Sequence, residues 1–448
     1  MNKNNNELLE IFSAALAAVD PYRAVLNSAR LERNVLHIAG VSYELEKYKR
    51  IVVVGAGKAT SRMAMAIEKL LGARISAGLI IVKDGHKSPL EIIRQIEASH
   101  PVPNQAGVNG TQKILQMAQL ADEQTLFICL LSGGASALLV APAEGVTLAD
   151  KQQVTGLLLN SGAVIEELNA VRKHLSAVKG GRLAQMAFPA QIVTLILSDV
   201  IGDRLDIIAS GPTAQDGSTF ADAWSVIEKY RLQNKIPMRV THHLQQGVAG
   251  KLSETVKQGD ACLHKTHNVM VGGIRLALDA AKDKSRQLGI RTEIISAELQ
   301  GEARDVAHFL AQTARATLGR MQANERRCLL SGGETTVAVS GTGMGGRNQE
   351  LALAFAIEAE GQQGLSLLSA GTDGTDGPND AAGAMVTGNM AAQAKKLGID
   401  PLQYLADNDS YHFFQKFDAA GSGEHAHLIT GPTGTNVMDI QIMLLNND

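Results

Sequence analysis

The strongest constraint on the fold is a repeated alternation of short, wholly apolar segments with longer segments of helical periodicity. RIVVVGAG at 50–57 is a β-branched run that ends in glycines, and residues 58–72 then place apolar side chains at helical spacing. The pattern recurs through AGLIIVKDG at 77–85, QTLFICLLSGG at 124–134 and QIVTLILSDV at 191–200. Apolar strands separated by helices are typical of a parallel sheet that is covered on both faces, so we expect the α/β class.

A second α/β series follows a polar, helical stretch at 220–259. It begins with HNVMVGG at 267–273 and includes the helix-like NQELALAFAIEAEG at 348–361. A chain of 448 residues is long enough for two or three domains. We therefore predict a Rossmann-like N-terminal parallel sheet in a domain of residues 1–250 and a second α/β domain of residues 251–448.

Composition narrows the range of partners. The 42 basic and 45 acidic residues give a formal net charge of −3, and aromatic residues are only 4%, so nucleic acid is not an expected partner. No apolar run approaches the roughly 20 residues of a membrane helix, and the three cysteines form no CxxC pair. We expect a cytoplasmic protein that does not bind membranes. Periodicity does not decide the oligomeric state, for which a homodimer is the working expectation.

The hexapeptide CLLSGG occurs twice, at 129–134 and at 328–333. In each copy an apolar run precedes a hydroxyl group and two glycines, so we expect a buried strand that ends in a glycine-rich turn. Ligands bind at the carboxyl edge of open α/β sheets. The two copies predict two ligand-binding edges, with tight strand exits that bind nothing as the alternative interpretation.

Glycine turns with cations beside them predict anion binding in the N-terminal half. GAGKAT at 55–60 places Lys58 at the start of a helix, where free N–H groups and a cation suit a phosphate. It resembles the dinucleotide pattern G-x-G-x-x-G/A, but the sixth position is Thr60 and no acidic residue follows about 20 positions later. The later segments LLSGGASAL and LNAVRKHLSAVKGGRLA add further candidates for binding a phosphate or carboxylate, namely Ser132, Gly133, Gly134, Ser136, Arg172 and Lys173.

Carboxylates follow two of the expected strands. Asp199 ends the apolar segment LILSD, where a carboxylate suits Mg²⁺ or proton abstraction from an alcohol, and helix capping is the alternative. SAGTDGTDGPNDAAG at 369–383 supplies Asp373 and Asp376, which suit either a metal-nucleotide site or turns made by aspartate side chains.

Arg347 has an unusual position. SGTGMGGRNQELALAF at 340–355 predicts a flexible loop containing Gly345 and Gly346, followed by an amphipathic helix with Arg347 in its first turn. The N-terminus of a helix already carries positive potential. An arginine there predicts an anion that the arginine and the helix share.

Glycine turns, adjacent cations and strand-end aspartates together favour phosphoryl transfer, which depends on charge neutralisation and in-line positioning. With VVVGAGKA, LLSGGASALL, LNAVRKHLSAVKGGRLA, LSDVIGDRLDIIASGPT, LSGGETTVAVSGTGMGGRNQELALAFA, SAGTDGTDGPNDAAGA and TGPTGTNVMDI in this order, the chain resembles the glycerate 2-kinase family, whose members have a C-terminal MOFRL domain. The resemblance spans nearly the whole chain. It implies ATP- and Mg²⁺-dependent phosphorylation of D-glycerate to 2-phosphoglycerate, in a cleft between two α/β domains.

The resemblance also implies roles for individual residues. Lys58, Asp199 and Arg347 are the expected catalytic residues, with Asp199 as base or metal ligand. The six phosphate candidates named above and Gly345 and Gly346 would contact substrate or phosphate. The expected nucleotide and metal contacts are Gly55, Gly57, Glu334 and Asp373 for the nucleotide, and Asp199, Asp373 and Asp376 for the metal. Arg204 stands where the family commonly has proline, in GDPLD, which affects the expected loop shape and adds a cation near Asp199.

Two other functions remain open from the sequence. Some family members carry the older label hydroxypyruvate reductase, so an NAD(P)H-dependent reductase with its nicotinamide nucleotide at GAGKAT is the main alternative. Thr60 and the missing acidic residue argue against it. A non-catalytic sensor of sugar acids is the third hypothesis, although the chain has no recognisable DNA-reading helix-turn-helix. The exact hydroxy acid is also open.

Overall fold

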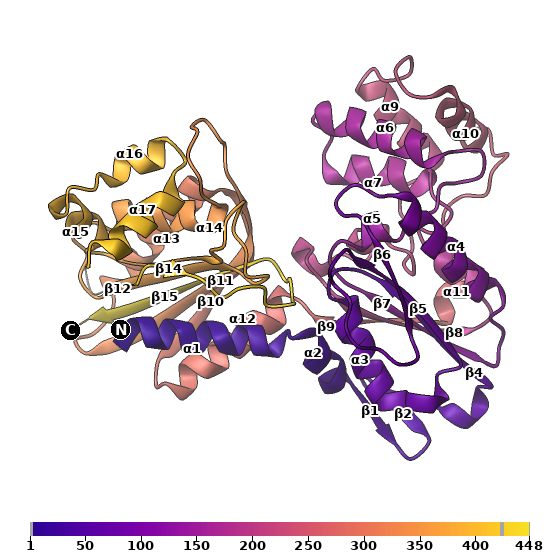
Figure 1. The fold of residues 1–448 in the computed structure, drawn as a ribbon, viewed down its shortest axis with the longest axis horizontal. Helices are drawn as coiled ribbons and strands as arrows, with labels where there is room; N and C mark the ends of the chain where they lie inside the picture. Colours follow the sequence, from indigo (N-terminus) through magenta and orange to yellow (C-terminus); the bar gives the residue numbers. More distant parts are fainter. Residues whose placement is uncertain (1–2, 422–424, 448) are drawn as a thin grey trace. The chain divides into compact units, whose positions relative to one another are not determined.

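The computed structural model describes residues 3–421 and 425–447, and the chain forms two compact units. The inserted unit comprises residues 21–271, and the terminal unit combines the described parts of residues 1–20 and 272–448. Both units are α/β, as the sequence predicts (Figure 1).

The inserted unit is built on a six-stranded sheet. Its strands are β4 (Arg50–Ala56), β5 (Ala77–Lys83), β6 (Arg94–Ala98), β7 (Thr125–Leu131), β8 (Gln191–Leu197) and β9 (Thr266–Gly272), in the order β6-β5-β4-β7-β8-β9. The pairs from β6 to β8 are parallel. All seven residues of β7 are buried, which explains why this strand is a continuous apolar run.

Helices cover this sheet and also form a separate cluster. The helices near the sheet are α2 (Pro21–Ser28), α3 (Thr60–Leu71), α4 (Gln105–Gln119), α5 (Ala135–Leu138), α8 (Arg182–Ala187) and α11 (Ala261–His264). The cluster consists of α6 (Leu148–Asn160), α7 (Ile165–His174), α9 (Phe220–Lys229) and α10 (Met238–Val248), which share a core of their own (Figure 1). A small antiparallel sheet of β1 (Ala29–Glu32), β2 (Val35–Ile38) and β3 (Val41–Glu44) completes the unit.

The terminal unit is built on a mixed sheet. Its strands are β10 (Arg291–Glu302), β11 (Glu325–Thr336), β12 (Leu365–Gly371), β13 (Gly383–Thr387), β14 (His427–Leu428) and β15 (Asp439–Asn447), in the order β10-β11-β15-β12-β13-β14. Its helices are α1 (Lys3–Ala18), α12 (Ile274–Gln287), α13 (Ala303–Leu318), α14 (Arg347–Glu358), α15 (Met390–Lys396), α16 (Pro401–Ala406) and α17 (Ser410–Ala419). The helices α1 and α12 cover one face, and α13 and α14 lie on the other (Figure 1).

The division between the units differs from the expected ranges 1–250 and 251–448 at two places. Helix α1 packs on α12 of the terminal unit through an apolar face that includes the fully buried Leu8 and Ile11. Strand β9, which contains most of HNVMVGG, lies beside β8 in the sheet of the inserted unit. The periodicity of a segment shows that it packs on a sheet, but it does not show which sheet. The chain passes from one unit to the other at 20/21 and at 271/272.

The second copy of CLLSGG does not end a strand, contrary to the expectation from the sequence. It lies inside β11, which continues through Thr336. A Cβ atom on Gly332 would lie 2.5 Å from Ile274 Cδ1, and one on Gly333 would lie 2.1 Å from the Leu299 carbonyl oxygen. These glycines therefore let α12 and β10 approach the strand closely, and they form no turn.

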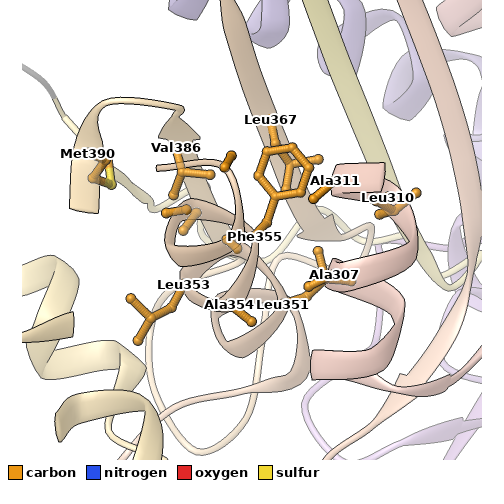
Figure 2. Packing of buried hydrophobic residues seen from close by; sticks show 14 of the residues in the cluster. Ala307, Leu310, Ala311, Leu351, Leu353, Ala354, Phe355, Leu367, Val386 and Met390 are labelled. Carbon is orange, nitrogen blue, oxygen red and sulfur yellow. The ribbon is translucent and has the colours of Figure 1, made fainter. Parts of the chain in front are cut away.

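Helix α14 passes through the core of the terminal unit. Residues 348–356 are all buried, so the helix is not amphipathic as predicted but covered on every side. Figure 2 shows Phe355 of α14 between the α13 residues near Ala311 and the strand residues Leu367 and Val386. This packing fixes the first turn of α14, where Arg347 lies.

Within residues 3–421 and 425–447, no helix combines the length and the apolar character needed to span a membrane.

Candidate active site

Two loops at the carboxyl edge of the parallel sheet are joined through Ser132. The hydroxyl of Ser132 accepts a hydrogen bond from the Ala59 N–H at 3.0 Å and lies 3.0 Å from the Thr60 hydroxyl. The loop after β4 thus packs directly on the loop after β7, and the first copy of CLLSGG ends its strand in a turn, as expected. Ser132 itself is 2% exposed, so its role in this geometry is to hold the two loops together.

Gly55 and Gly57 are explained by the same close packing. A Cβ atom on Gly55 would lie 2.3 Å from the Leu130 carbonyl oxygen. At Gly57, where φ is +142°, a Cβ atom would lie 2.1 Å from Ser132 Oγ. Both positions require glycine for contacts within the protein. Their expected contact with a nucleotide stays a prediction.

The side chains of Lys58, His100 and Asp199 surround the turn at Gly133–Gly134. A Cβ atom on Gly133 would lie 2.3 Å from Asp199 Oδ2, and one on Gly134 would lie 3.0 Å from His100 Cδ2 and 3.3 Å from Lys58 Cγ. Among residues 3–421 and 425–447, the Lys58 ammonium has no hydrogen bond or ion pair. The turn therefore presents bare backbone with a cation, an imidazole and a carboxylate around it.

Sequence reasoning missed His100. Burial and the neighbouring charges of Lys58, Lys83 and His86 lower the pKa of His100 to about 4, so its ring is neutral near pH 7. Its position two residues after β6, at the same sheet edge as Lys58, is the signal that could have identified it.

A cavity of about 440 Å³ opens beside this turn, between the 100–103 segment, α6 and α7. We call it the cationic cavity because Lys151, Arg172 and Lys179 line it together with His100, Gly134 and Ser136. The Lys179 ammonium donates hydrogen bonds to Ser136 O at 2.8 Å, to Ser136 Oγ at 3.0 Å and to Ala209 O at 3.3 Å. The Lys151 ammonium donates to the carbonyl oxygens of Leu175 at 2.8 Å and Arg172 at 3.2 Å.

These cations repel one another in a desolvated environment. Burial and the charge of Arg172 lower the pKa of Lys151 to about 7. Burial, together with the charges of Lys151, Arg172 and Lys173, lowers the pKa of Lys179 well below its usual value. Lys151 was not identified from the sequence, because a lone lysine on a helix usually lies in solvent.

Lys173, which the sequence predicted to contact the substrate, has internal partners. Its ammonium lies 3.1 Å from Asp216 and 3.7 Å from Asp206, and its side chain is only 5% exposed. Successive helical residues point about 100° apart, so Arg172 faces the cavity while Lys173 does not. Arg204 is likewise held by carboxylates, at 3.0 Å from Asp206 and 3.2 Å from Glu166.

The loop between β8 and α9 carries backbone strain close to the cationic cavity. Ala209 and Ser210 have positive φ angles of 53° and 60°. Ser210 Oγ lies 2.8 Å from Ser136 Oγ, and the Ala209 carbonyl accepts a hydrogen bond from Lys179. Strained residues of this kind are concentrated at functional sites.

In the terminal unit, Arg347 is neutralised by carboxylates of the chain itself. Its Nε and Nη2 donate to the two oxygens of Asp439 at 2.6 and 2.9 Å, and its Nη1 donates to Glu334 at 2.7 Å. Burial alone would lower the pKa of Arg347, but Asp439 and Glu334 raise it above the ordinary value. The anion that the sequence predicted for this arginine is thus partly internal. Asp439, which is fully buried, was missed.

Asp376 caps α14. One carboxylate oxygen accepts from the backbone and side-chain nitrogens of Asn348 at 3.0 and 3.3 Å, and the other accepts from those of Gln349 at 2.8 and 3.0 Å. Burial raises the pKa of Asp376 to about 6, against the opposite effect of these N–H groups. Both oxygens are fully used, so we leave Asp376 out of the proposed metal ligands.

Asp373 lies in the same loop as Asp376, between β12 and β13. Its Oδ1 accepts from the Thr375 N–H and hydroxyl, both at 3.0 Å, which is the side-chain turn that was one of the two predicted alternatives. A Cβ atom on Gly371 would lie 3.4 Å from Asp373 Oδ1 and 3.5 Å from Asp439 Oδ1, so the two carboxylates are neighbours.

The glycine loop before Arg347 is held in place, and the expected flexibility is wrong. The Gly343 N–H donates to Asp407 O at 2.9 Å, and the Met344 N–H donates to Asp409 Oδ1 at 2.9 Å. A Cβ atom on Gly345 would lie 2.3 Å from Ser410 Oγ, and one on Gly346 would lie 2.2 Å from Asp376 O. The expected contact of these two glycines with the substrate stays a prediction.

Residues 3–421 and 425–447 contain no group of three or more Asp, Glu, His or Cys side chains placed to hold a metal ion.

Comparisons with known proteins give the family context. Residues 7–245 match the family described as a domain of unknown function, DUF4147, and residues 327–439 match the MOFRL family. A D-glycerate 2-kinase of Thermotoga maritima is 44% identical over 398 residues, which cover 88% of this chain and 91% of that protein. A putative hydroxypyruvate reductase of Agrobacterium vitis is 42% identical over 403 residues, 88% of this chain and 99% of that protein. The crystal structure of a glycerate kinase from Thermotoga maritima matches with a TM-score of 0.86 and 41% identity, covering 98% of this chain and 99% of that one.

Proposed function

This chain belongs to the glycerate 2-kinase family, and we propose that it transfers the terminal phosphoryl group of ATP to the 2-hydroxyl of D-glycerate. The observation that carries the proposal is the turn at Gly133–Gly134, where bare backbone lies beside the Asp199 carboxylate and Lys58, whose ammonium has no partner among the described residues. Phosphoryl transfer needs cations and N–H groups around the phosphate and a carboxylate near the acceptor hydroxyl, and this turn supplies both.

In the proposed reaction the 2-hydroxyl oxygen forms a bond to the γ-phosphorus while the bond from that phosphorus to the bridging oxygen of ADP breaks. ADP keeps the electron pair. Asp199 receives the hydroxyl proton, and Lys58 neutralises charge on the transferred group. Arg347 has five N–H donors and uses three on Asp439 and Glu334, so two remain for an anionic ligand.

We further propose Mg²⁺ as the metal of the reaction, with Asp373 as its protein ligand. One oxygen of Asp373 is engaged in a turn, and a carboxylate is the donor that Mg²⁺ prefers. In nucleotide sites Mg²⁺ binds through one or two carboxylates and phosphate oxygens, and when bound it neutralises charge on the phosphates. The shared cleft, the homodimer and the cytoplasmic location stay predictions.

The loop geometry supports a kinase over a reductase. In a dinucleotide-binding turn, glycines let the pyrophosphate approach the backbone at the start of the helix. Here the Ser132 hydroxyl lies against Gly57 and takes the hydrogen bond of the Ala59 N–H. The space and the donor that a pyrophosphate would use are therefore occupied by the protein.

Phosphorus NMR after mixing the protein with Mg-ATP and D-glycerate tests the proposal. We expect ADP and 2-phosphoglycerate, with no product when EDTA removes the magnesium. A parallel assay follows NADH absorbance with hydroxypyruvate. Oxidation of NADH without consumption of ATP would reassign the chain as a reductase, and no turnover in either assay with any hydroxy acid would favour the sensor.

A further inference from the structure

The cationic cavity is lined by basic side chains without acidic ones among its described residues. Lys151, Arg172 and Lys179 line it, and no aspartate or glutamate is among its lining residues. In the part of the chain that the structure describes, the Arg172 guanidinium has no ion pair and no side-chain hydrogen bond. Burial lowers the pKa of Arg172, so its charge is partly desolvated without compensation. Such charges are costly unless an anion pairs with them.

The same cavity has an apolar wall. Val102 and Leu159 line it and are 61% and 56% exposed, so they offer apolar surface to a ligand. Pro101 and Pro103 extend this wall. The ligand that fits such a surface has an apolar part as well as an anionic part.

Size and chemistry together distinguish between the two substrates of the proposed kinase. Every carbon of glycerate carries oxygen, so glycerate offers little apolar surface to this wall. The volume of about 440 Å³ lies within the range of pockets that hold ligands much larger than a three-carbon acid. A nucleotide has both required parts, since its base and ribose offer flat, weakly polar surface and its phosphates are anionic.

We propose that the cationic cavity is the nucleotide subsite, with the base and ribose against Val102 and Leu159 and the phosphates on Arg172 and the Gly134 turn. This rests on the proposed function and assigns the phosphoryl donor to the inserted unit. Gly134 and His100 line the cavity, and a Cβ atom on Gly134 would lie 3.3 Å from Lys58 Cγ, so a phosphate chain at this turn lies close to Lys58. The Lys151 ammonium makes two hydrogen bonds to carbonyls and keeps one N–H for a phosphate oxygen.

Gly156 of α6 gives a steric test. It lines the cavity, its φ is not in the left-handed region, and a Cβ atom on it would meet nothing within 4 Å. Gly156→Leu therefore adds an apolar side chain to the cavity from a position where its Cβ atom meets no other atom, and it also favours the helix. Asn160→Leu, on an exposed position of the same helix that does not line the cavity, is the matched control.

Calorimetric titrations of the full-length protein with MgADP, magnesium tripolyphosphate and D-glycerate separate the parts of the ligand. We expect Gly156→Leu to weaken MgADP binding at least tenfold and to leave tripolyphosphate and glycerate unchanged, because only the base meets the added side chain. Arg172→Gln should weaken MgADP and tripolyphosphate by about 10- to 100-fold, the effect of one or two charge-assisted hydrogen bonds. Asn160→Leu should bind all three like the wild type.

Other outcomes would overturn the inference. If Gly156→Leu weakens glycerate and not MgADP, the cavity is the acceptor site, and if it changes none of the three titrations, the cavity holds neither substrate. Both results leave the proposed kinase activity standing, because turnover of the wild type is measured separately by phosphorus NMR. Absence of that turnover, with MgADP still bound and still weakened by Gly156→Leu, would contradict the kinase and keep the nucleotide site.

Discussion

The two copies of CLLSGG have different structures although their sequences are identical. In the first copy, β7 ends at Leu131, and the next three residues turn into α5. In the second, β11 continues through the whole hexapeptide to Thr336. The glycines differ accordingly. Gly134 has a φ of 84° and makes a turn, whereas Gly332 and Gly333 give room to Ile274 and Leu299.

The residues that follow each copy account for the difference. ASAL after the first copy consists of small and helix-favouring residues, and it forms α5. ETT after the second includes β-branched threonines, which favour a strand. The electrostatic result also differs, because the first copy lies beside Lys58, which is unpaired within residues 3–421 and 425–447, while Glu334 directly after the second copy binds Arg347. The inserted unit therefore keeps Lys58 available for a ligand, whereas in the terminal unit Asp439 and Glu334 neutralise Arg347.

The largest expected effect is that of Arg347→Ala. It leaves the fully buried Asp439 charged and without its partner, so unfolding free energy should fall by about 3 kcal/mol, at the low end for a buried pair because Arg347 is 35% exposed. Turnover should be lost as well. Urea denaturation and a coupled ATP assay measure the two effects. The double variant Arg347→Ala/Asp439→Asn should regain stability and no activity, and an unchanged urea midpoint for the single variant would contradict the internal pairing.

Lys58→Ala should affect only the reaction. Because the ammonium has no partner in the described chain, the urea midpoint should not change. Loss of one well-placed cation should lower kcat by about 10²- to 10³-fold. Lys69→Ala, on an exposed position of helix α3, which begins two residues after Lys58, is the control and should behave like the wild type. Near-normal kcat in Lys58→Ala would remove this residue from the site.

Gly333→Ala should mainly lower the stability of the protein, whereas Gly133→Ala should mainly lower its activity. At Gly333 the added carbon meets backbone, 2.1 Å from Leu299 O at a φ of 155°, so we expect a loss of about 2–3 kcal/mol in unfolding free energy. At Gly133 it meets the end of a side chain and no backbone atom, 2.3 Å from Asp199 Oδ2, so the carboxylate must shift. Gly133→Ala should therefore lower kcat with a small change in stability. The reverse pattern would show that the two copies have been assigned the wrong roles.

Nucleotide binding should take up protons above neutral pH. The pKa of Lys151 is about 7, so this side chain is mostly neutral at pH 8, and a bound polyanion favours its charged form and raises its pKa. Lys179 and His100, whose pKa values are also lowered, face the same cavity and act in the same direction, while Arg172 stays charged. Titrations with MgADP in two buffers of different ionisation enthalpy should show uptake at pH 8 and less at pH 6. Lys151→Met should reduce the uptake, and proton release at pH 8 would contradict the placement of phosphates.

The smallest expected effect is that of Arg204→Pro, which introduces the residue common in the family. The φ of Arg204 is −67°, a value that proline adopts without strain. The lost ion pairs with Glu166 and Asp206 are exposed and worth about 0–1 kcal/mol, and the gain from proline is about 0.4–1 kcal/mol. The urea midpoint should therefore barely change. A large loss would show that Arg204 holds the loop.

The sequence predicted the strands well, because a buried parallel strand is a continuous apolar run and little else in a globular chain resembles it. The runs at 50–57, 77–85, 124–134 and 191–200 correspond to β4, β5, β7 and β8. The sequence did not predict which unit contains β9 and α1, because their packing partners depend on tertiary structure and not on a local pattern.

The candidate site was predictable where backbone and charge occur in one segment, as at Lys58 and the Gly133–Gly134 turn. It was not predictable where function depends on a partner far along the chain. Asp439 completes the environment of Arg347 from 92 residues away, and Lys151 reaches the cationic cavity from a helix that carries no motif. Lys173 and Asp376 had suitable chemistry, but their internal contacts are visible only in three dimensions.

The placement of α1 and β15 at opposite ends of the sequence has a consequence for biosynthesis. Strand β15 lies between β11 and β12, so the strand of this sheet that is synthesised last occupies its middle. The sheet of the terminal unit therefore stays incomplete until β15 has been synthesised, although α1 is made first, whereas residues 21–271 are all available much earlier. A nascent chain stalled shortly after residue 271 has emerged should already protect the parallel sheet from protease while leaving α1 open to cleavage.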